Sequence, residues 1–144
     1  MIASIAGRRS EHCDALVADY VKRTSAYLPI STEVFRTSKT LFGMLAQQRS
    51  RLAAALVMLD SGGIQFSSEE LARWFRRQRD ESRQRLVFAV GPADGWSDED
   101  RAHASLLLSL GPMTLPHELA RVVLCEQVYR AFTILAGHPY HTGH

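Results

Sequence analysis

The chain of 144 residues has few cysteines, no long apolar run and little net charge, and each shortage excludes a class of protein. Its two cysteines, Cys13 and Cys125, stand far apart and outside any paired spacing, which argues against a disulfide scaffold or a zinc module. The longest apolar stretches are too short to cross a bilayer, and residues 1–4 do not begin a signal peptide. We therefore expect a cytoplasmic protein without membrane association, folded as a single domain over residues 1–144.

Familiar catalytic and nucleotide-binding motifs are also missing from the sequence. It contains no Walker A motif, GxGxxG, GxSxG or HExxH. Three histidines, His138, His141 and His144, recur every three residues in the carboxyl-terminal tail. A metal site needs preorganised ligands, which a tail beyond the end of a helix rarely supplies. We therefore predict no metal site.

Lysine is scarce among the cations, and arginine is concentrated in one stretch. Of 17 basic residues only Lys22 and Lys39 are lysines. Six arginines fall within thirteen residues: Arg73, Arg76, Arg77, Arg79, Arg83 and Arg85. Arginine suits planar, bidentate contacts with phosphate. Two interpretations stay open, a solvated helix face and a surface that binds nucleic acid.

Short apolar runs alternate with helical patterns along the chain. The runs predict strands over residues 2–6, 30–35, 54–59, 86–90 and 106–110. Helices are predicted over 11–25 and 39–52, after the capping residues Ser67 and Ser97, and from Pro116 to a stop at Gly137. This alternation predicts an α/β fold with a mainly parallel sheet flanked by helices.

Three loops that follow predicted strands are rich in glycine or proline, namely 60–63, 91–95 and 111–116. Ligands of parallel α/β sheets bind at the carboxyl ends of the strands, so these loops are the expected site. Residues 60–63 are predicted to form a turn. Asp60 in that turn is interpreted as a turn or helix cap in preference to a catalytic acid.

The final helical pattern is unusually apolar. Twelve of the nineteen residues from 117 to 135 are apolar, and they are spread around the helix axis. A helix that covers only its own sheet would keep a polar face. We therefore expect a second copy of the chain to cover this helix, which predicts a homodimer. Glu118 with Arg121, and Glu126 with Arg130, have the spacing of ion pairs within a helix.

The carboxyl-terminal half resembles a known bacterial family. The resemblance rests on the run TLPHELARVVLCEQVYRAF from Thr114 to Phe132 and on the closing HPYH of residues 138–141. Upstream, Leu59-Asp60 and the segments 67–69 and 91–95 follow in the same order. Together these motifs resemble the SPOUT-class methyltransferases that modify N3 of a pseudouridine in 23S ribosomal RNA of the large ribosomal subunit. The match covers about residues 56–141.

The resemblance implies a trefoil-knotted α/β fold, a homodimer, S-adenosylmethionine as the methyl donor and ribosomal RNA or the assembled ribosome as the partner. In the family the donor lies in a cleft formed by loops after three strands. Carried over to this chain, the cleft residues are Leu59, Gly91, Leu110, Gly111, Pro112, Met113, Thr114 and Leu115. The family has two adjacent glycines where this chain has Gly91-Pro92, and proline removes one backbone N–H there.

The resemblance also implies that the carboxyl-terminal tail enters the partner's active site. Tyr140 and His141 are therefore candidates for handling the proton or the charge of pseudouridine N3. Arg130 is a candidate for positioning a phosphate or a uracil oxygen. Structural interpretations stay open for all three: Tyr140 as a packed aromatic, His141 at a frayed end, and Arg130 as the ion-pair partner of Glu126.

Two other functions remain alternatives at this point. One is a non-catalytic RNA-binding or ribosome-assembly factor that keeps the fold without the chemistry, which Pro92 motivates. The other is a SPOUT methyltransferase that acts on transfer RNA, against which the HPYH tail argues. The intact segment 110–115 and the intact tail favour the active ribosomal RNA enzyme.

Overall fold

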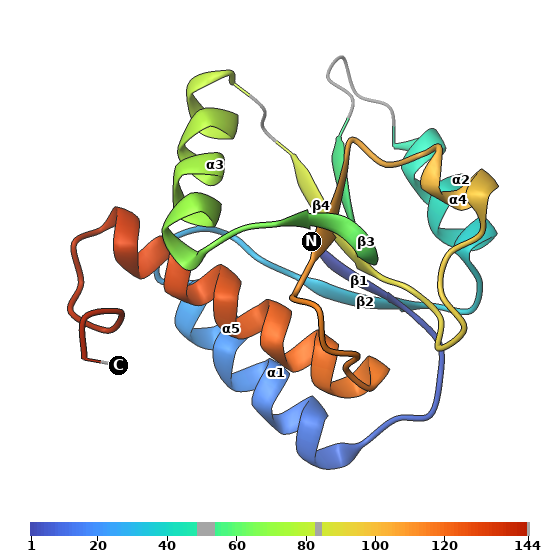
Figure 1. Ribbon diagram of the computed structural model, residues 1–144, viewed down its shortest axis with the longest axis horizontal. Helices are drawn as coiled ribbons and strands as arrows, with labels where there is room; N and C mark the ends of the chain where they lie inside the picture. The colour runs from blue at the N-terminus through green and yellow to red at the C-terminus, as the bar shows by residue number, and fades with distance from the viewer. Residues whose placement is uncertain (49–53, 83–84, 144) are drawn as a thin grey trace.

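The computed structural model describes residues 1–48, 54–82 and 85–143 (Figure 1). Within these residues, five strands form one sheet in the order β2-β1-β4-β3-β5, and every pairing is parallel. The elements in chain order are β1 (Ile2–Ile5), α1 (Glu11–Thr24), β2 (Thr32–Phe35), α2 (Ser38–Gln47), β3 (Ala55–Gln65), α3 (Ser68–Asp80), β4 (Leu86–Val90), α4 (Asp98–Arg101), β5 (Leu106–Ser109) and α5 (His117–Leu135). The predicted α/β fold with a parallel sheet is confirmed.

Helices cover both faces of the sheet, so the molecule has three layers (Figure 1). On one face α1, α3 and α5 bury a cluster that includes Val17, Phe75 and Leu124. On the other face α2 and the α4 segment bury a second cluster that includes Leu41 and Trp96. Because both faces are covered, the central strands are apolar throughout, and residues 55–58 of β3 are all buried.

Local sequence signals explain where the helices begin. Ser67 and Glu70 form the predicted capping box at the start of α3, in which each side chain accepts a backbone N–H of the other residue. Ser97 and Asp100 form an equivalent box before α4. The predicted starts of both helices are thus confirmed. Gly137, just beyond α5, has a φ of 69°, a conformation that glycine adopts readily.

The predicted turn at residues 60–63 is wrong in one respect, because β3 continues through it to Gln65. Leu59 and Ile64 both pair with Leu108 of β5, so residues 60–63 form a bulge inside the strand. A Cβ on Gly63 would lie 2.6 Å from the Leu107 carbonyl carbon and oxygen, so the two backbones approach too closely for any side chain. Pairing with β5 therefore carries the strand past the turn residues.

Smaller differences concern the ends of elements. β2 begins at Thr32, two residues after the predicted start, and α2 ends at Gln47. The remainder of the predicted 39–52 helix falls partly on residues 49–53, which lie outside the described residues. No helix in the described part of the chain is long and apolar enough to cross a membrane.

A buried arginine joins α5 to α1. Arg121 is only 6% exposed and donates hydrogen bonds to Glu118 Oε2 from Nε at 3.1 Å and Nη2 at 2.7 Å. Nη2 also bonds to Asp14 of α1. Burial alone would lower the pKa of Arg121, but the bonds to the two carboxylates outweigh it and raise the pKa. The same hydrogen bond lowers the pKa of Asp14 below its ordinary value. The predicted Glu118–Arg121 pair is confirmed.

Replacing Arg121 by Met should lower the free energy of unfolding by about 1–3 kcal/mol, because Glu118 loses its partner inside the α1–α5 contact and Asp14 is left with its ion pair to Arg9. The folded pKa of Asp14 is depressed, so its stabilisation is complete above the ordinary Asp pKa of about 3.9 and is lost as the pH falls through the folded value. The stability difference between wild type and Arg121→Met should therefore be full at pH 7 and shrink below about pH 4. Urea unfolding at several pH values measures it.

Arg76→Met on the exposed side of α3 is the matched control and should change stability little. An Arg121→Met protein as stable as wild type at pH 7 would contradict this account of the α1–α5 contact.

Candidate functional site

Three adjacent strands bring the predicted cofactor residues to one edge of the sheet. β3 lies between β4 and β5, and all three run in the same direction. Leu59 lies in β3 opposite Leu108 of β5, Gly91 directly follows β4, and the segment 110–115 directly follows β5. The structure therefore places these residues, from three separate parts of the sequence, level with the carboxyl ends of β4 and β5, although β3 itself continues to Gln65.

The segment after β5 is shaped by a glycine and a buried serine. Gly111 has a φ of 132°, which side-chain-bearing residues rarely adopt. The Ser109 hydroxyl accepts the Gly111 N–H at 3.2 Å and donates to the Gly111 carbonyl at 3.0 Å. Beyond this turn Met113 is 82% exposed, and Leu115 is half-buried. The segment after β5 therefore carries an exposed apolar side chain next to a turn that Ser109 holds.

The loop after β4 does not need a backbone N–H at position 92, where proline has none. The Gly95 N–H donates to the Pro92 carbonyl at 2.9 Å and closes the loop, and Gly95 has a φ of 86°. Gly91 faces the indole ring of Trp96, where a Cβ would lie 2.7 Å from Cε2. Pro92 is therefore compatible with the turn, and Gly91 is needed to make room for the tryptophan.

Asp60 has the structural role that its sequence context indicates. One carboxylate oxygen accepts the Gly62 N–H at 2.8 Å, and the other accepts Arg101 Nε at 2.8 Å. Burial alone would raise the pKa of Asp60, but the bonds from Arg101 and from the Gly62 N–H lower it below the usual range. Asp60 therefore stays ionised and holds the bulge of β3 to α4.

The three predicted catalytic residues lie together beside α5. Arg130 donates to Glu126 Oε1 from Nη2 at 2.6 Å and from Nε at 3.0 Å, which confirms the predicted pair. The Tyr140 hydroxyl donates to the same oxygen at 3.0 Å, and the Arg130 guanidinium carbon lies 4.9 Å from the centre of the Tyr140 ring. Arg130 Nη1 also lies 3.4 Å from His141 Nδ1. Glu126 is thus the centre of the group.

The environment of Tyr140 keeps its phenol protonated. Burial raises the pKa of Tyr140 well above its usual value, and hydrogen bonds with Tyr20 and Glu126 raise it further. Its ring also packs against Tyr129, with centroids 4.8 Å apart. Tyr140 is therefore a hydrogen-bond donor and a packed aromatic in this structure.

Glu69, which the sequence interpretation did not select, holds the other side of His141. Its Oε1 lies 2.7 Å from His141 Nε2. Hydrogen bonding to its own backbone N–H, and then to His141, lowers the pKa of Glu69. The alternative interpretation of His141 as a frayed end does not fit these contacts, because the ring lies against both α3 and α5. The only sequence signal for Glu69 was its place in the segment 67–69.

Within one chain, the predicted cofactor residues and the carboxyl-terminal tail lie far apart. The segment 110–115 precedes α5, and Tyr140 and His141 follow it. α5 has 19 residues, which at 1.5 Å per residue separate its ends by roughly 28 Å. Figure 1 shows the carboxyl terminus at one end of α5 and the segment that follows β5 at the other. The predicted cofactor residues and the predicted catalytic residues form two separate groups.

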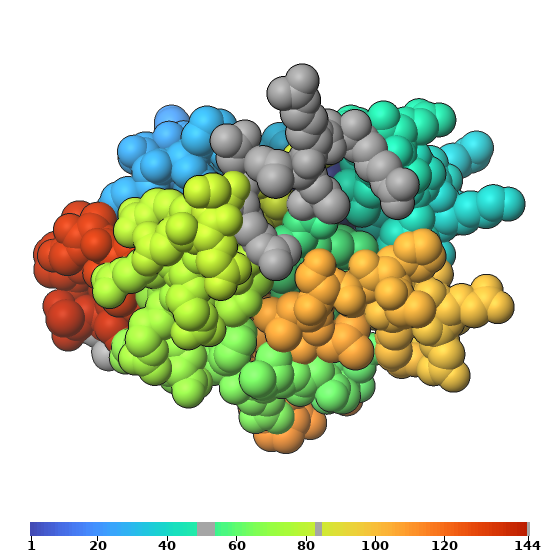
Figure 2. All heavy atoms as spheres, turned by 90° about the horizontal axis from the view of Figure 1, so that it is seen from above, coloured from blue at the N-terminus to red at the C-terminus, as the bar shows by residue number. Residues whose placement is uncertain are grey.

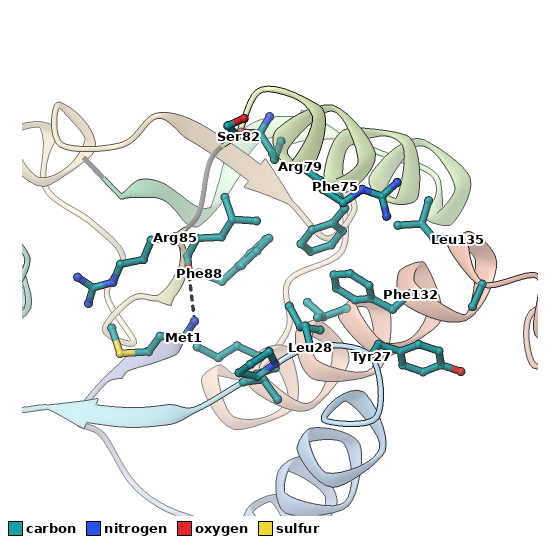
Figure 3. Close-up of a pocket in the computed structure, with 17 residues that line it drawn as sticks. Met1, Tyr27, Leu28, Phe75, Arg79, Ser82, Arg85, Phe88, Phe132 and Leu135 are labelled. Carbon is teal, nitrogen blue, oxygen red and sulfur yellow. Dashed lines mark hydrogen bonds between the residues drawn. The ribbon is translucent and has the colours of Figure 1, made fainter. Parts of the chain in front are cut away.

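A cavity of about 640 Å³ is lined in part by the carboxyl-terminal half of α5 (Figure 3). Its walls include Phe75, Phe88 and Phe132, and the Met1 amino group that lines it donates to the Leu86 carbonyl at 2.9 Å. Since Met1 and Leu86 stand at the amino ends of their strands, the cavity lies at the edge of the sheet opposite the predicted cleft. None of the predicted site residues lines it.

The arginine-rich stretch lies mainly on the outside of α3. Four arginines of α3 are exposed, namely Arg73, Arg76, Arg77 and Arg79. The helix lies next to the carboxyl-terminal tail (Figure 2). Arg85 is half-buried and bonds to Gln48. Arg83 lies outside the described residues. The structure is compatible with either a solvated face or a surface for nucleic acid.

Comparison with known proteins gives consistent results. The model of the family described as "Predicted SPOUT methyltransferase" matches residues 1–141. A protein of Koribacter versatilis named Ribosomal RNA large subunit methyltransferase H is 48% identical over 90% of this chain and 88% of its own length. A protein of the same name from Gloeobacter violaceus is 38% identical over 99% of this chain and 97% of its own length.

A solved structure agrees with these sequence matches at the level of the fold. The SpoU methyltransferase AviRb from Streptomyces viridochromogenes, solved in complex with the cofactor AdoMet, superposes with a TM-score of 0.55 at 10% identity. The match covers 90% of this chain and 56% of AviRb. The family model and the two relatives extend over nearly the whole chain, so this protein belongs to the SPOUT methyltransferase family.

Proposed function

We propose that this chain transfers a methyl group from S-adenosylmethionine to N3 of a pseudouridine in 23S ribosomal RNA, in the cytoplasm. The observation that carries the proposal is similarity over almost the full length to proteins named Ribosomal RNA large subunit methyltransferase H. Those names favour ribosomal RNA over transfer RNA as the substrate, and an enzyme over a non-catalytic assembly factor.

The residues at the strand ends fit a nucleoside cofactor. The turn at Gly111 leaves backbone groups near the ends of β3, β4 and β5, and backbone N–H and C=O groups can pair with the edge of an adenine. The exposed Met113 side chain and the half-buried Leu115 side chain supply apolar surface for the faces of the ring. We therefore assign cofactor binding to Leu59, Gly91, Leu110, Gly111, Pro112, Met113, Thr114 and Leu115.

The reaction needs alignment more than acid–base power. When bound, S-adenosylmethionine supplies a methyl group on a positively charged sulfur, and the transfer needs no metal. The cleft residues would hold that methyl group roughly 3–3.5 Å from the nucleophilic nitrogen. Arg130, with its charge shared with Glu126, would orient the uracil ring or a phosphate. Tyr140 would donate a hydrogen bond, and His141 would accept the N3 proton through a ring nitrogen once that nitrogen leaves its present contact with Arg130 or Glu69.

A homodimer would unite the two groups of residues. The tail lies about one α5 length from the cleft of its own chain, so a second copy would have to supply it. Leu16 of α1 and Leu119 of α5 are both 47% exposed on helices that pack together, which provides apolar surface for a second copy. The trefoil knot also stays a prediction from the family resemblance.

Methyl transfer to ribosomes tests the proposed function directly. Ribosomes from cells that lack the family enzyme should accept labelled methyl from S-adenosylmethionine, and nucleoside analysis should identify N3-methylated pseudouridine. Pro92→Gly should remain active, because the loop closes through the Pro92 carbonyl and not through an N–H at that position.

Two controls decide the outcome. Gly111→Val should lose at least about tenfold in cofactor affinity, because valine in that left-handed conformation costs roughly 1–3 kcal/mol. Binding of the wild-type protein to these ribosomes without any methyl transfer would contradict the proposal and favour the non-catalytic assembly factor. Methylation of purified transfer RNA in place of the ribosome would favour the transfer RNA enzyme.

Mixed dimers test whether the site is built from two chains. Gly111→Val impairs the proposed cleft and Tyr140→Phe impairs the proposed tail, so each variant alone should be several-fold less active than wild type at donor concentrations below the wild-type KM. A co-expressed mixture should recover part of the activity, because one kind of heterodimer site contains an intact cleft and an intact tail.

Activity in the mixture no higher than the sum of the two separate variants would contradict a composite site. A mixture of Gly111→Val with Leu59→Arg is the matched control: both changes lie in the cleft, so each chain of this heterodimer carries an impaired cleft, and no activity should return.

Salt dependence tests the arginine surface of α3. Replacing Arg76, Arg77 and Arg79 together by Gln should weaken binding to the ribosomal RNA substrate. It should also reduce the slope of log K against log salt by roughly 0.7 for each phosphate of single-stranded RNA that the variant no longer neutralises. Lys22→Gln with Lys39→Gln removes exposed cations elsewhere and should leave the slope nearly unchanged. An unchanged slope in the arginine variant would identify this face as merely solvated.

A further inference from the structure

Trp96 lies between two walls of the proposed cleft, on the face of the sheet that α2 and α4 cover. It is 4% exposed and packs in the cluster that contains Met58, Val87 and Ala89. Phe42 lies beside it, with ring centroids 6.4 Å apart. Trp96 is the first residue after the loop 91–95, so its position depends on the conformation of that loop.

The indole of Trp96 contacts Leu59 of β3 and Gly91, the residue that follows β4. Its Nε1–H donates a hydrogen bond to the Leu59 carbonyl of β3 at 2.8 Å. Its ring faces Gly91 so closely that a Cβ there would lie 2.8 Å from Nε1 and 2.7 Å from Cε2. One side chain thus fixes how Leu59, in the middle of β3, lies relative to the residue that follows β4.

A second contact holds the same two segments together. Arg101 Nε donates to Asp60 at 2.8 Å, and Arg101 Nη1 donates to Asp98 at 2.9 Å. Asp60 directly follows Leu59, and Arg101 ends the short helix after Trp96. The bulge of β3 is therefore attached to the segment 96–101 at two points, one neutral and one charged.

We propose that Trp96 is a positioning residue for the methyl donor: it sets the distance between Leu59 and Gly91 and so holds two walls of the cleft in place before the donor binds. The inference rests on the proposed function, since Leu59 and Gly91 matter to catalysis only if they bind the donor. Preorganised walls reduce the ordering that binding must accomplish, so Trp96 acts on affinity for the donor.

The hydrogen bond from the indole N–H distinguishes a positioning role of Trp96 from simple packing in the core. A residue that only fills the core could be replaced by Phe, which is also aromatic and apolar. Trp96→Phe keeps a ring against Gly91 but leaves the Leu59 carbonyl without its donor. If the hydrogen bond positions the wall, this change weakens donor binding although the fold is retained.

Trp74 provides the matched control. It is the only other tryptophan in the sequence, is also buried, and packs against Phe75 and Phe88 on the opposite face of the sheet. Trp74→Phe and Trp96→Phe remove the same atoms from similarly buried sites. Their comparison separates an effect on the cleft from the general cost of replacing an indole.

The first measurement is titration with S-adenosylmethionine by calorimetry, together with steady-state methyl transfer. Trp96→Phe should bind the donor about three- to tenfold more weakly, the effect of losing one hydrogen bond. Its KM for the donor should rise by a similar factor, with kcat at saturating donor within about twofold of wild type. Trp74→Phe should match wild type in both quantities.

The two variants are also reciprocal single-tryptophan reporters. In Trp74→Phe all indole emission comes from Trp96, and this emission should shift or change in intensity as the donor is added. In Trp96→Phe the emission comes from Trp74 and should stay constant. This test keeps Trp96 in place, so it remains decisive if Trp96→Phe folds poorly.

The outcomes are distinct. Equal donor affinity in wild type and Trp96→Phe, or a Trp96 emission that ignores the donor, would overturn the positioning role and leave the proposed function standing. Failure of the wild type to bind S-adenosylmethionine at all would overturn both. An equal loss of affinity in Trp74→Phe and Trp96→Phe would also overturn it, because the effect would then come from general destabilisation.

Discussion

The length and rigidity of α5 govern the arrangement of the whole molecule. The helix packs against α1 and α3, and its buried residues run from Arg121 to Thr133, so it cannot bend to bring its two ends together. The segment that follows β5 therefore stays at one end, and the tail with Tyr140 stays at the other. A chemistry that needs both groups has to be assembled between chains, and the apolar composition around the helix provides surface for such an assembly.

Each end of α5 is secured by a carboxylate and an arginine. Near its start, Arg121 joins Glu118 to Asp14 of α1, and near its end Arg130 joins Glu126 to the tail. The second pair also contacts a proposed catalytic residue, because Glu126 accepts a hydrogen bond from the Tyr140 hydroxyl. Burial and the hydrogen bond to Glu126 raise the pKa of Tyr140, so its phenol acts as a hydrogen-bond donor in this group.

The sequence predicted the parallel α/β fold and the family resemblance, but its predictions of individual contacts were local. Ser67 with Glu70 marks a helix start, and the apolar run at 55–58 marks a buried strand, because both signals involve residues close together in the chain. The bulge at 60–63 was missed because its strand continues only through pairing with Leu108 of β5. The contacts of Trp96 with Leu59 and of Glu69 with His141 span 37 and 72 residues, and no local pattern encodes such a distance.

Pro92, which stands where the resembled family has a glycine, and Trp96 both constrain the loop after β4. A proline after Gly91 fixes one φ angle and removes a donor, which stiffens the loop but gives it no attachment to β3. The indole supplies that attachment, since it donates to the Leu59 carbonyl while its ring occupies the space that a side chain at 91 would need. A loop stiffened by proline and held by one buried ring needs less ordering when a ligand binds than a loop with two adjacent glycines would need.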